Sequence, residues 1–352
     1  MSEPRFVGLD VHKDVIVATT VGPSGPRLDQ TQLGPDPKLL IEYLRRFPGE
    51  LHVTLEACPV WQPYYDAAVQ AGAEVKLAHP AGVKWIAKAK KKNDKIDSEK
   101  LATLLRNGDI PEAYAPTAEE RQLRRVVRDW FFFDRKAVAV MNHTYGILLQ
   151  KGVRYPEGIL RLKRKREELR QLGIPDVSRG LDALRALDPV LKELEKTVEG
   201  TYQRSSEAQL LTSIPGVGKK VAVTLTAYLC PIGRFHNLDE IAAYCGLCPR
   251  TSQSSKRAWI GELRQDSNHL LSAMLTQAYW AHRRRSKGSV ISRAAKKKER
   301  KNGRQAGAIA GAHKLLDIAC AILRRGTPYE FHAPERPSCN VDPAEPKGVA
   351  LC

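Results

Sequence analysis

Long hydrophobic runs are missing from this chain of 352 residues, and no stretch reaches the ~20 apolar residues of a membrane-spanning helix. The opening MSEPRFVGLD lacks the apolar segment of a signal peptide. The seven cysteines are odd in number and scattered, which argues against a disulfide framework. Hydrophobic residues still make up 42%, which excludes a wholly disordered chain. We therefore expect a cytoplasmic, globular protein of two or three domains with no membrane partner.

Acidic residues are scarce relative to basic ones. The chain has 57 Lys and Arg against 39 Asp and Glu, so its net charge is +18. Such a field favours a polyanionic partner, most often nucleic acid. Eleven basic residues and one acid stand between Arg283 and Arg304. One such run could be a solvated surface, but a second run from Lys84 to Lys92 contains no acid and strengthens the case for nucleic acid.

The first third of the chain alternates strand and helix patterns. RFVGLDVHKDVIVATTV predicts two strands joined as a hairpin at HKD. The patterns that follow predict an α/β layer with mixed strands. They are a helix over 35–47, a strand over 50–57, a helix over 61–72 that ends at Gly72, a strand over 73–80 and a helix from Asp94 to Leu105.

The remainder reads as mostly helical. Thr117 and Glu120 form a possible capping box. Apolar residues then recur at helical spacing over 123–148 and 181–198. The two helices could pair as an antiparallel coiled coil or pack within one domain, and Pro189 is expected to kink or break the second. We predict a domain over 1–115, a helical region over 116–203, a third domain over 204–330 that ends in an apolar helix, and a loose Pro-rich tail over 331–352.

Four acids stand where they could converge. Asp10 ends the first predicted strand, Glu56 ends the strand over 50–57, and Asp94 and Asp97 lie three apart at a helix start. Ligands bind outside the strand ends of α/β sheets, and residues i and i+3 share a helix face. Clustered carboxylates need a cation, and hard oxygens select Mg²⁺ or Mn²⁺. A pair of such ions suits phosphodiester cleavage, although ordinary salt-bridged acids would give the same pattern.

A second pattern, LLTSIPGVGKKVAVTLTAYL, resembles a helix-hairpin-helix motif. Gly216 and Gly218 allow a tight turn whose backbone N–H groups could bind a phosphate, and Lys219 and Lys220 follow at the next helix start. A plain helical turn is the alternative.

The motifs together resemble one family over about residues 5–330. GLDVHK, KNDKIDSEKLATLLRNG, LLTSIPGVGKKVA, IAAYCGLCPR and AGAIAGAHKLLDIACAIL occur in one order. This order is similar to that of the DEDD transposases of the IS110 family, recombinases of bacterial insertion sequences that also include Piv-type DNA invertases.

The resemblance implies a Holliday-junction-resolvase-like (RNase H-type) fold whose metal ligands are Asp10, Glu56, Asp94 and Asp97. It implies that Ser254, in TSQSS, attacks a DNA phosphate and becomes covalently joined to it. It also implies dimers and tetramers on donor and target DNA, with the acids of one subunit completing a site with the serine of another. In some members a bridge RNA pairs with both DNAs.

The sequence departs from the family at Ser255, where a glycine is common. Loss of that glycine removes backbone freedom beside Ser254. We expect nucleic-acid contacts from basic residues near both predicted sites and in the long basic run: Lys88, Lys90, Lys91, Lys92, Arg250, Lys256, Arg257, Arg283, Arg284 and Arg285. A hydrolytic junction resolvase, a site-specific DNA invertase and a catalytically idle nucleic-acid-binding protein are the alternatives.

Overall fold

The computed structural model describes residues 3–86, 94–254, 257–263 and 267–330. At Trp85, Asp94, Lys95, 249–254 and 257–263 it describes the backbone alone. The chain divides into two compact units, Met1–Thr117 and Ala118–Cys352.

The first unit is built on a five-stranded mixed sheet with strand order β3-β2-β1-β4-β5. β1 is antiparallel to β2 and parallel to β4, and β4 is parallel to β5. The predicted hairpin at HKD is confirmed, since the His12 N–H donates to the Val15 carbonyl at 2.9 Å. The strands are β1 Arg5–Val11, β2 Ile16–Val21, β3 Arg27–Leu33, β4 Leu51–Glu56 and β5 Glu74–Ala78.

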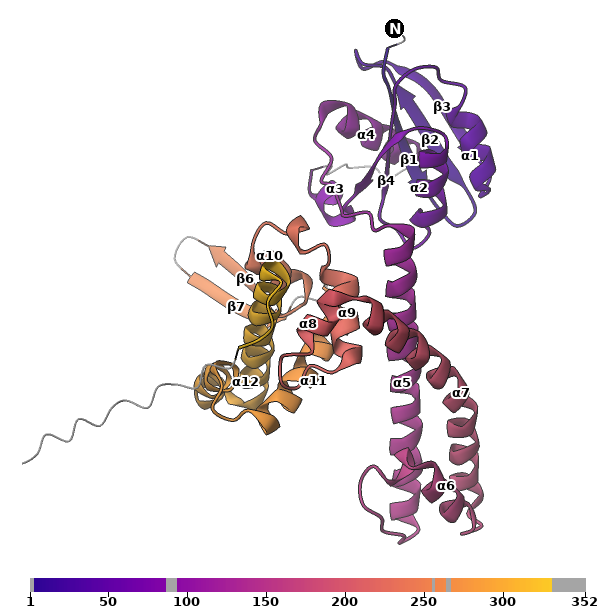
Figure 1. Cartoon of the computed structure of the whole chain (residues 1–352). Helices are drawn as coiled ribbons and strands as arrows, with labels where there is room; N and C mark the ends of the chain where they lie inside the picture. The colour runs from indigo at the N-terminus through magenta and orange to yellow at the C-terminus, as the bar shows by residue number, and fades with distance from the viewer. Residues whose placement is uncertain (1–2, 87–93, 255–256, 264–266, 331–352) are drawn as a thin grey trace, which may run out of the picture. The chain divides into compact units, whose positions relative to one another are not determined.

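Helices cover both faces of this sheet (Figure 1). α1 and α2 share a buried apolar cluster with the strands, in which Leu40 and Tyr64 pack with Leu9 and Leu55. α4 lies on the other face. The helices of this unit are α1 Pro37–Leu44, α2 Trp61–Gln70, α3 Pro80–Ile86 and α4 Asp94–Asn107. The predicted helices and strands up to Leu105 are thus confirmed.

β3 is a strand that the sequence patterns did not predict. Its residues, RLDQTQL, are mostly polar and exposed or half-buried. It lies at the edge of the sheet, where a strand needs only one neighbour. Without a buried face it shows no apolar alternation.

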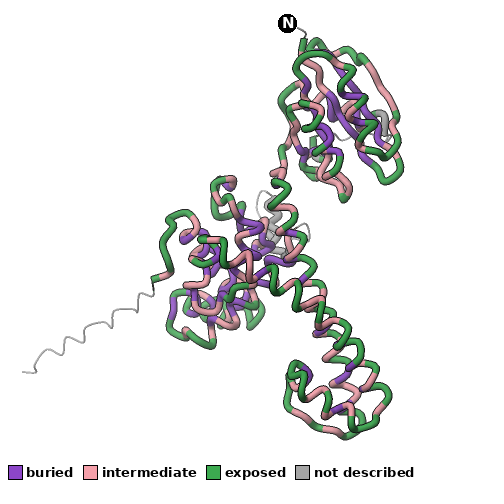
Figure 2. The backbone as a smooth tube through the Cα atoms, turned by 45° about the vertical axis from the view of Figure 1, so that its right-hand side comes forward, coloured by how far each residue is buried: buried purple, intermediate pink, exposed green. Residues whose placement is uncertain are grey.

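In the second unit, two long helices run antiparallel: α5 (Ala118–Gln150) and α7 (Pro175–Arg204). Trp130 and Val198 belong to one buried cluster, and Thr144 touches Gly180, where a Cβ would lie 2.0 Å from the Thr144 hydroxyl. α5 and α7 lie side by side in both views (Figures 1 and 2), and exposed residues follow their outer faces. α5 begins directly after Thr117, as expected.

α7 is continuous through Pro189, so of the expected kink or break the break is wrong and the kink stays a prediction. Proline removes the hydrogen bond to the carbonyl four residues earlier, here Arg185. Both residues are exposed, so water can satisfy that carbonyl. The helix pair is closed at its far end by η1 Ile159–Arg161 and α6 Lys163–Arg170.

The remaining helices of this unit contribute to one large core with the near ends of α5 and α7, and two short strands lie between α10 and α11 in the chain. They are α8 Ser206–Leu211, α9 Lys219–Leu229, η2 Ile232–Arg234, α10 Leu238–Tyr244, β6 Pro249–Ser254, β7 Arg257–Leu263, α11 His269–Arg285 and α12 Val290–Arg325. β6 and β7 form an antiparallel hairpin that the sequence patterns did not predict.

α12 is two helices interrupted at Gly303, whose φ of 85° is left-handed. By length and composition it is the one described helix that could cross a membrane. Its apolar half, however, packs in the core through Ala308, Ala312, Leu315 and Ala319. It is therefore a core helix of the second unit.

Candidate active site

Two of the predicted acids lie at the carboxyl ends of neighbouring parallel strands: Asp10 is the last residue but one of β1, and Glu56 is the last residue of β4. Leu9 of β1 and Leu55 of β4 are Cα partners, and Asp10 and Glu56 follow them directly. Both acids are half-buried, and the Asp10 side chain is 20% exposed. Because paired residues of parallel strands point to the same side, Asp10 and Glu56 share one face at the carboxyl end of the strands.

That face is the one covered by α4. Gly8 is two residues before Asp10, and alternate residues of a strand share a face. A Cβ at Gly8 would lie 2.1 Å from the Ser98 carbonyl oxygen and 2.4 Å from the Ala102 nitrogen. The backbone of α4 therefore rests directly on β1 beside Asp10.

The start of α4 lies toward the carboxyl ends of β1 and β4. Arg106, near the end of α4, reaches Gly25 in the turn after β2, where a Cβ would lie 2.2 Å from its guanidinium. That turn adjoins the beginning of β1, since β1 and β2 are antiparallel. α4 thus runs opposite to β1. One turn back from Ser98 covers about 6 Å, and two residues along β1 from Gly8 cover about 6.6 Å. Position 94 is therefore level with Asp10.

Replacing Gly8 with alanine should misplace α4. The new methyl would clash with backbone atoms, which cannot rotate away, and overpacking of this kind costs about 1–3 kcal/mol. We expect a lower free energy of unfolding in urea and reduced DNA cleavage. Gly22→Ala is the matched control, because a Cβ there meets only the Leu28 side chain at 3.7 Å. Equal stability of the two variants would contradict the close packing of α4.

Two acids of this site, Asp10 and Asp97, have a basic side chain as neighbour. The carboxylate of Asp10 lies 3.2 Å from Nε2 of His12, and that of Asp97 lies 2.8 Å from Nζ of Lys100. Among the described residues, the three carboxylates do not form a group with all ligand atoms within 4.8 Å. The first unit thus places these carboxylates at one end of the sheet, but their oxygens are not close enough together to surround a cation.

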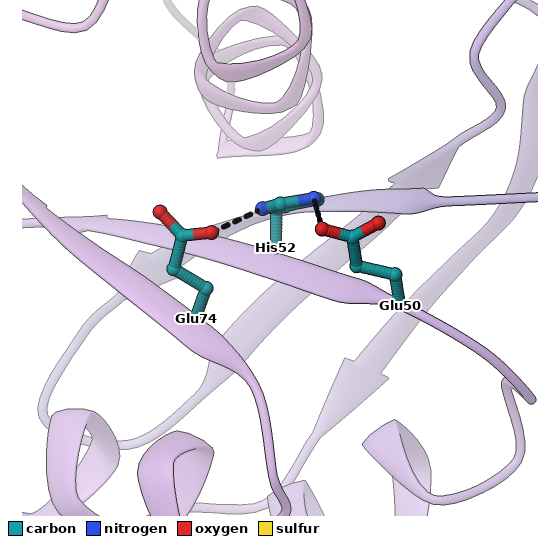
Figure 3. A group of neighbouring side chains, drawn as sticks. All are labelled: Glu50, His52 and Glu74. Atoms are coloured by element: carbon teal, nitrogen blue, oxygen red, sulfur yellow. Dashed lines mark ion pairs between the residues drawn. The ribbon is translucent and has the colours of Figure 1, made fainter.

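In the described part of the chain, one group of three side chains does have its possible ligand atoms within 4.8 Å of one another. It lies at the opposite end of the same sheet (Figure 3). His52 bridges two glutamates: Nδ1 lies 3.0 Å from Glu74, and Nε2 lies 3.2 Å from Glu50. The ring also stacks on Phe6, with centroids 5.1 Å apart. Both nitrogens of the His52 ring face a carboxylate, and they lie on opposite sides of the ring. A single cation could therefore bind only one of the two nitrogens. No sequence pattern indicates this group, since Glu74 becomes a neighbour of His52 only through the β4–β5 register.

Ser254 is the last residue of β6. It pairs with Arg257, the first residue of β7, so it stands at the tip of the hairpin. Its side chain, with those of Arg250 and Arg257, is outside the described atoms, as are Lys256 and the lysines at 88 and 90–92.

The predicted turn between two helices is present at Gly216, with a φ of 99°. A Cβ there would lie 2.4 Å from the backbone nitrogen of His282, so the turn packs against α11. Nδ1 of His282 donates to the Pro215 carbonyl at 2.6 Å, and burial lowers the pKa of this histidine. Gly218 caps α9 without a side-chain hydrogen bond.

The two lysines after this turn are paired with acids of α7. Lys219 Nζ lies 2.6 Å from Glu199, and Lys220 contacts Glu195. Lys219 also lies over the ring of Tyr202 at 5.0 Å. A phosphate at this turn would have to compete with these glutamates.

Two family models match the chain. The model described as "Transposase" of the DEDD, IS110 type matches residues 7–151, and that of the "Transposase IS116/IS110/IS902 family" matches residues 208–296. Together they cover more than half of its length and both structural units. The chain belongs to the IS110 family of transposases. It is thus an enzyme that cuts and rejoins DNA.

Relatives of this transposase have related descriptions. It is 24% identical to the transposase for insertion sequence element IS1111A of Coxiella burnetii, over 95% of this chain and 93% of that protein. It is 24% identical to the transposase for insertion sequence element IS1328 of Yersinia enterocolitica, over 79% and 85%. A pilin gene-inverting protein of Moraxella lacunata is 29% identical over 42% of this chain and 46% of its own.

The donors of the transposase fit a hard divalent cation. Carboxylate oxygens are the ligands that Mg²⁺ and Mn²⁺ prefer. Asp10 and Glu56 come from rigid strand ends, and Asp97 comes from the helix that Gly8 allows onto the sheet. The family supports use of a divalent metal.

The CGLC sequence of the transposase is part of its core. Cys245 is fully buried, and burial raises the pKa of its thiol far above the usual range. A thiol held protonated is a poor nucleophile and a poor metal ligand.

Proposed function

We propose that this transposase breaks and rejoins DNA through a covalent phosphoserine at Ser254, assisted by a divalent ion held by Asp10, Glu56, Asp94 and Asp97. The observation that carries the metal site is the parallel pairing of β1 with β4, which sets Asp10 beside Glu56 under the start of α4. On this proposal the first unit is an RNase H-like catalytic domain, as its mixed sheet supports.

In the cleavage step, the Ser254 oxygen forms a bond to phosphorus. The bond from phosphorus to one sugar oxygen breaks, and that oxygen leaves as a hydroxyl carrying the proton that serine gives up. In rejoining, a hydroxyl of the incoming strand attacks the phosphoserine and serine is released. The phosphodiester bond energy is conserved, so no ATP is needed.

The four acids and Ser254 have different roles in this reaction. A serine hydroxyl is a weak nucleophile at its free pKa and needs activation. Bound at the four acids, Mg²⁺ or Mn²⁺ would supply that activation and stabilise charge on the phosphate. The carboxylates orient the ion, and the hairpin tip presents Ser254 to the phosphorus.

We further propose a guide RNA and a homo-oligomer as partners, on the strength of the family resemblance. Sequence choice would then rest on base pairing, and the protein would contact mainly backbone and shape. DNA remains the substrate in either case.

The test is the metal dependence of cleavage. Excess EDTA should reduce strand cleavage by at least ~100-fold, because removing the ion removes several kcal/mol of transition-state stabilisation. Readdition of Mg²⁺ or Mn²⁺ should restore it. Binding to a labelled DNA duplex, measured in parallel, should persist in EDTA. Undiminished cleavage in EDTA would contradict the metal site.

A further inference from the structure

We propose that the first half of α12 is a surface for the sugar–phosphate backbone of a DNA duplex, formed by five residues called here the basic face. This inference rests on the proposed function and specifies where a polyanion is held. The basic face consists of Arg293, Lys296, Lys297, Arg300 and Lys301.

The five residues lie on one side of the helix. Their spacing of three, four, seven and eight residues follows the helical period. Ile291 and Ala295 are fully buried on the opposite side. All five are exposed, and they alone line a surface hollow of about 370 Å³.

The charge of this surface is largely unneutralised. No acidic side chain in the described chain pairs with Lys296, Lys297, Arg300 or Lys301. Arg293 donates only to the Gly288 carbonyl, at 3.1 Å. Lys219, Lys220 and Arg283 differ, because each is paired with a glutamate.

Arg283 shows the difference within the same basic run. Its guanidinium lies 2.8 Å from Glu299 and 5.4 Å from the Trp280 ring, where Arg304 also stacks at 4.9 Å. Arg283 and Arg304 therefore fasten α12 to α11. Arg284 and Arg285 are exposed.

The supporting helix is held firmly. Ser289 caps it by accepting from the Ser292 N–H at 3.1 Å and also contacts Nε2 of buried His282 at 2.6 Å. After the reversal at Gly303, Gly307 packs on Ala295 and Glu299, where a Cβ would lie 2.6 Å from the Glu299 side chain. A fixed helix loses little conformational entropy when its exposed side binds a ligand.

The length of the basic face suits several phosphates. From Arg293 to Lys301 the helix rises about 12 Å. Phosphates recur every ~3.4 Å along the axis for each strand of a DNA duplex. Three or four phosphates are therefore within reach of the four unpaired cations.

The experiment compares wild type with Lys296→Ala/Lys297→Ala/Arg300→Ala. Binding to a 30-base-pair DNA duplex and to an RNA duplex of the same length is measured from 50 to 300 mM salt, without divalent metal. We expect the slope of log K against log salt to fall in magnitude by about three, one for each lost phosphate contact. A change in slope with the RNA duplex alone would overturn DNA as the occupant of this surface.

Two controls separate the possible failures. Lys38→Ala/Arg45→Ala/Arg46→Ala removes the same charge from the region of α1, on the far side of the sheet from α4, and should leave the slope unchanged. Lys296→Arg/Lys297→Arg/Arg300→Lys keeps the charge and should bind as wild type. An unchanged slope in the alanine variant, or an equal loss in the α1 control, would overturn the basic face while leaving the proposed chemistry intact. No binding by wild type would count against the proposed function itself.

Discussion

Ser254→Ala is expected to eliminate the covalent protein–DNA adduct. No other atom of the residue can form the phosphoester, so adduct formation should fall by at least ~1,000-fold, as for loss of other serine nucleophiles. A nicked duplex that traps the cleaved strand, run on a denaturing gel, measures the adduct. Binding to intact duplex should stay within ~2-fold of wild type, because one hydroxyl among many phosphate contacts contributes little affinity.

The neighbouring serines are the controls for this result. Ser252 lies two positions before Ser254, and Ser255 follows it. Ser252→Ala and Ser255→Ala should retain the adduct. An undiminished adduct in Ser254→Ala with loss in either neighbour would move the nucleophile. Cleavage without any adduct in wild type would instead favour a metal-dependent hydrolase.

Asp10→Asn and Glu56→Gln should each lower cleavage by at least ~100-fold. Each substitution replaces a charged carboxylate with a neutral amide of nearly the same shape. The loss of charge weakens binding of a hard cation. Wild type should gain thermal stability when Mg²⁺ is added, because the ion binds only the folded site. Both variants should lose that gain. Differential scanning fluorimetry with and without Mg²⁺ measures it apart from activity.

Glu74→Gln is the matched control at the other end of the sheet. It also removes one carboxylate, from the group around His52. We expect it to keep both cleavage and the Mg²⁺-dependent rise in Tm. Loss of the rise in Glu74→Gln, with retention in Asp10→Asn, would place the cation at the Glu50–His52–Glu74 group instead.

Much of the first unit was predictable because its signals are local. A buried strand such as LHVTLE can be predicted from its apolar residues. Asp10 and Glu56 stand near the ends of such strands in the sequence. Gly8 carries no such signal. Its role follows from α4, which lies some 90 residues later in the chain and meets β1 only in the folded protein.

The second unit was less predictable because its features depend on partners. The β6–β7 hairpin around Ser254 has polar residues in both strands, so no apolar alternation identifies it. The run from Arg283 to Arg304 looks uniform as a sequence. Its division into Arg283, which is paired with Glu299, and the exposed basic face depends on how the first half of α12 packs against α11 in the folded protein. The predicted boundary at 203/204 stays a prediction.

Mapping the DNA-linked residue tests the central proposal most directly. The trapped adduct is digested with nuclease and trypsin, and the peptides are fragmented by mass spectrometry. Cleavage after Arg250 and Lys256 releases the peptide TSQSSK, which contains all three candidate serines. The proposal predicts a nucleotide mass on this peptide, assigned to Ser254, and only in reactions that contain Mg²⁺ or Mn²⁺. A nucleotide on another residue, or the same adduct formed in EDTA, would contradict it.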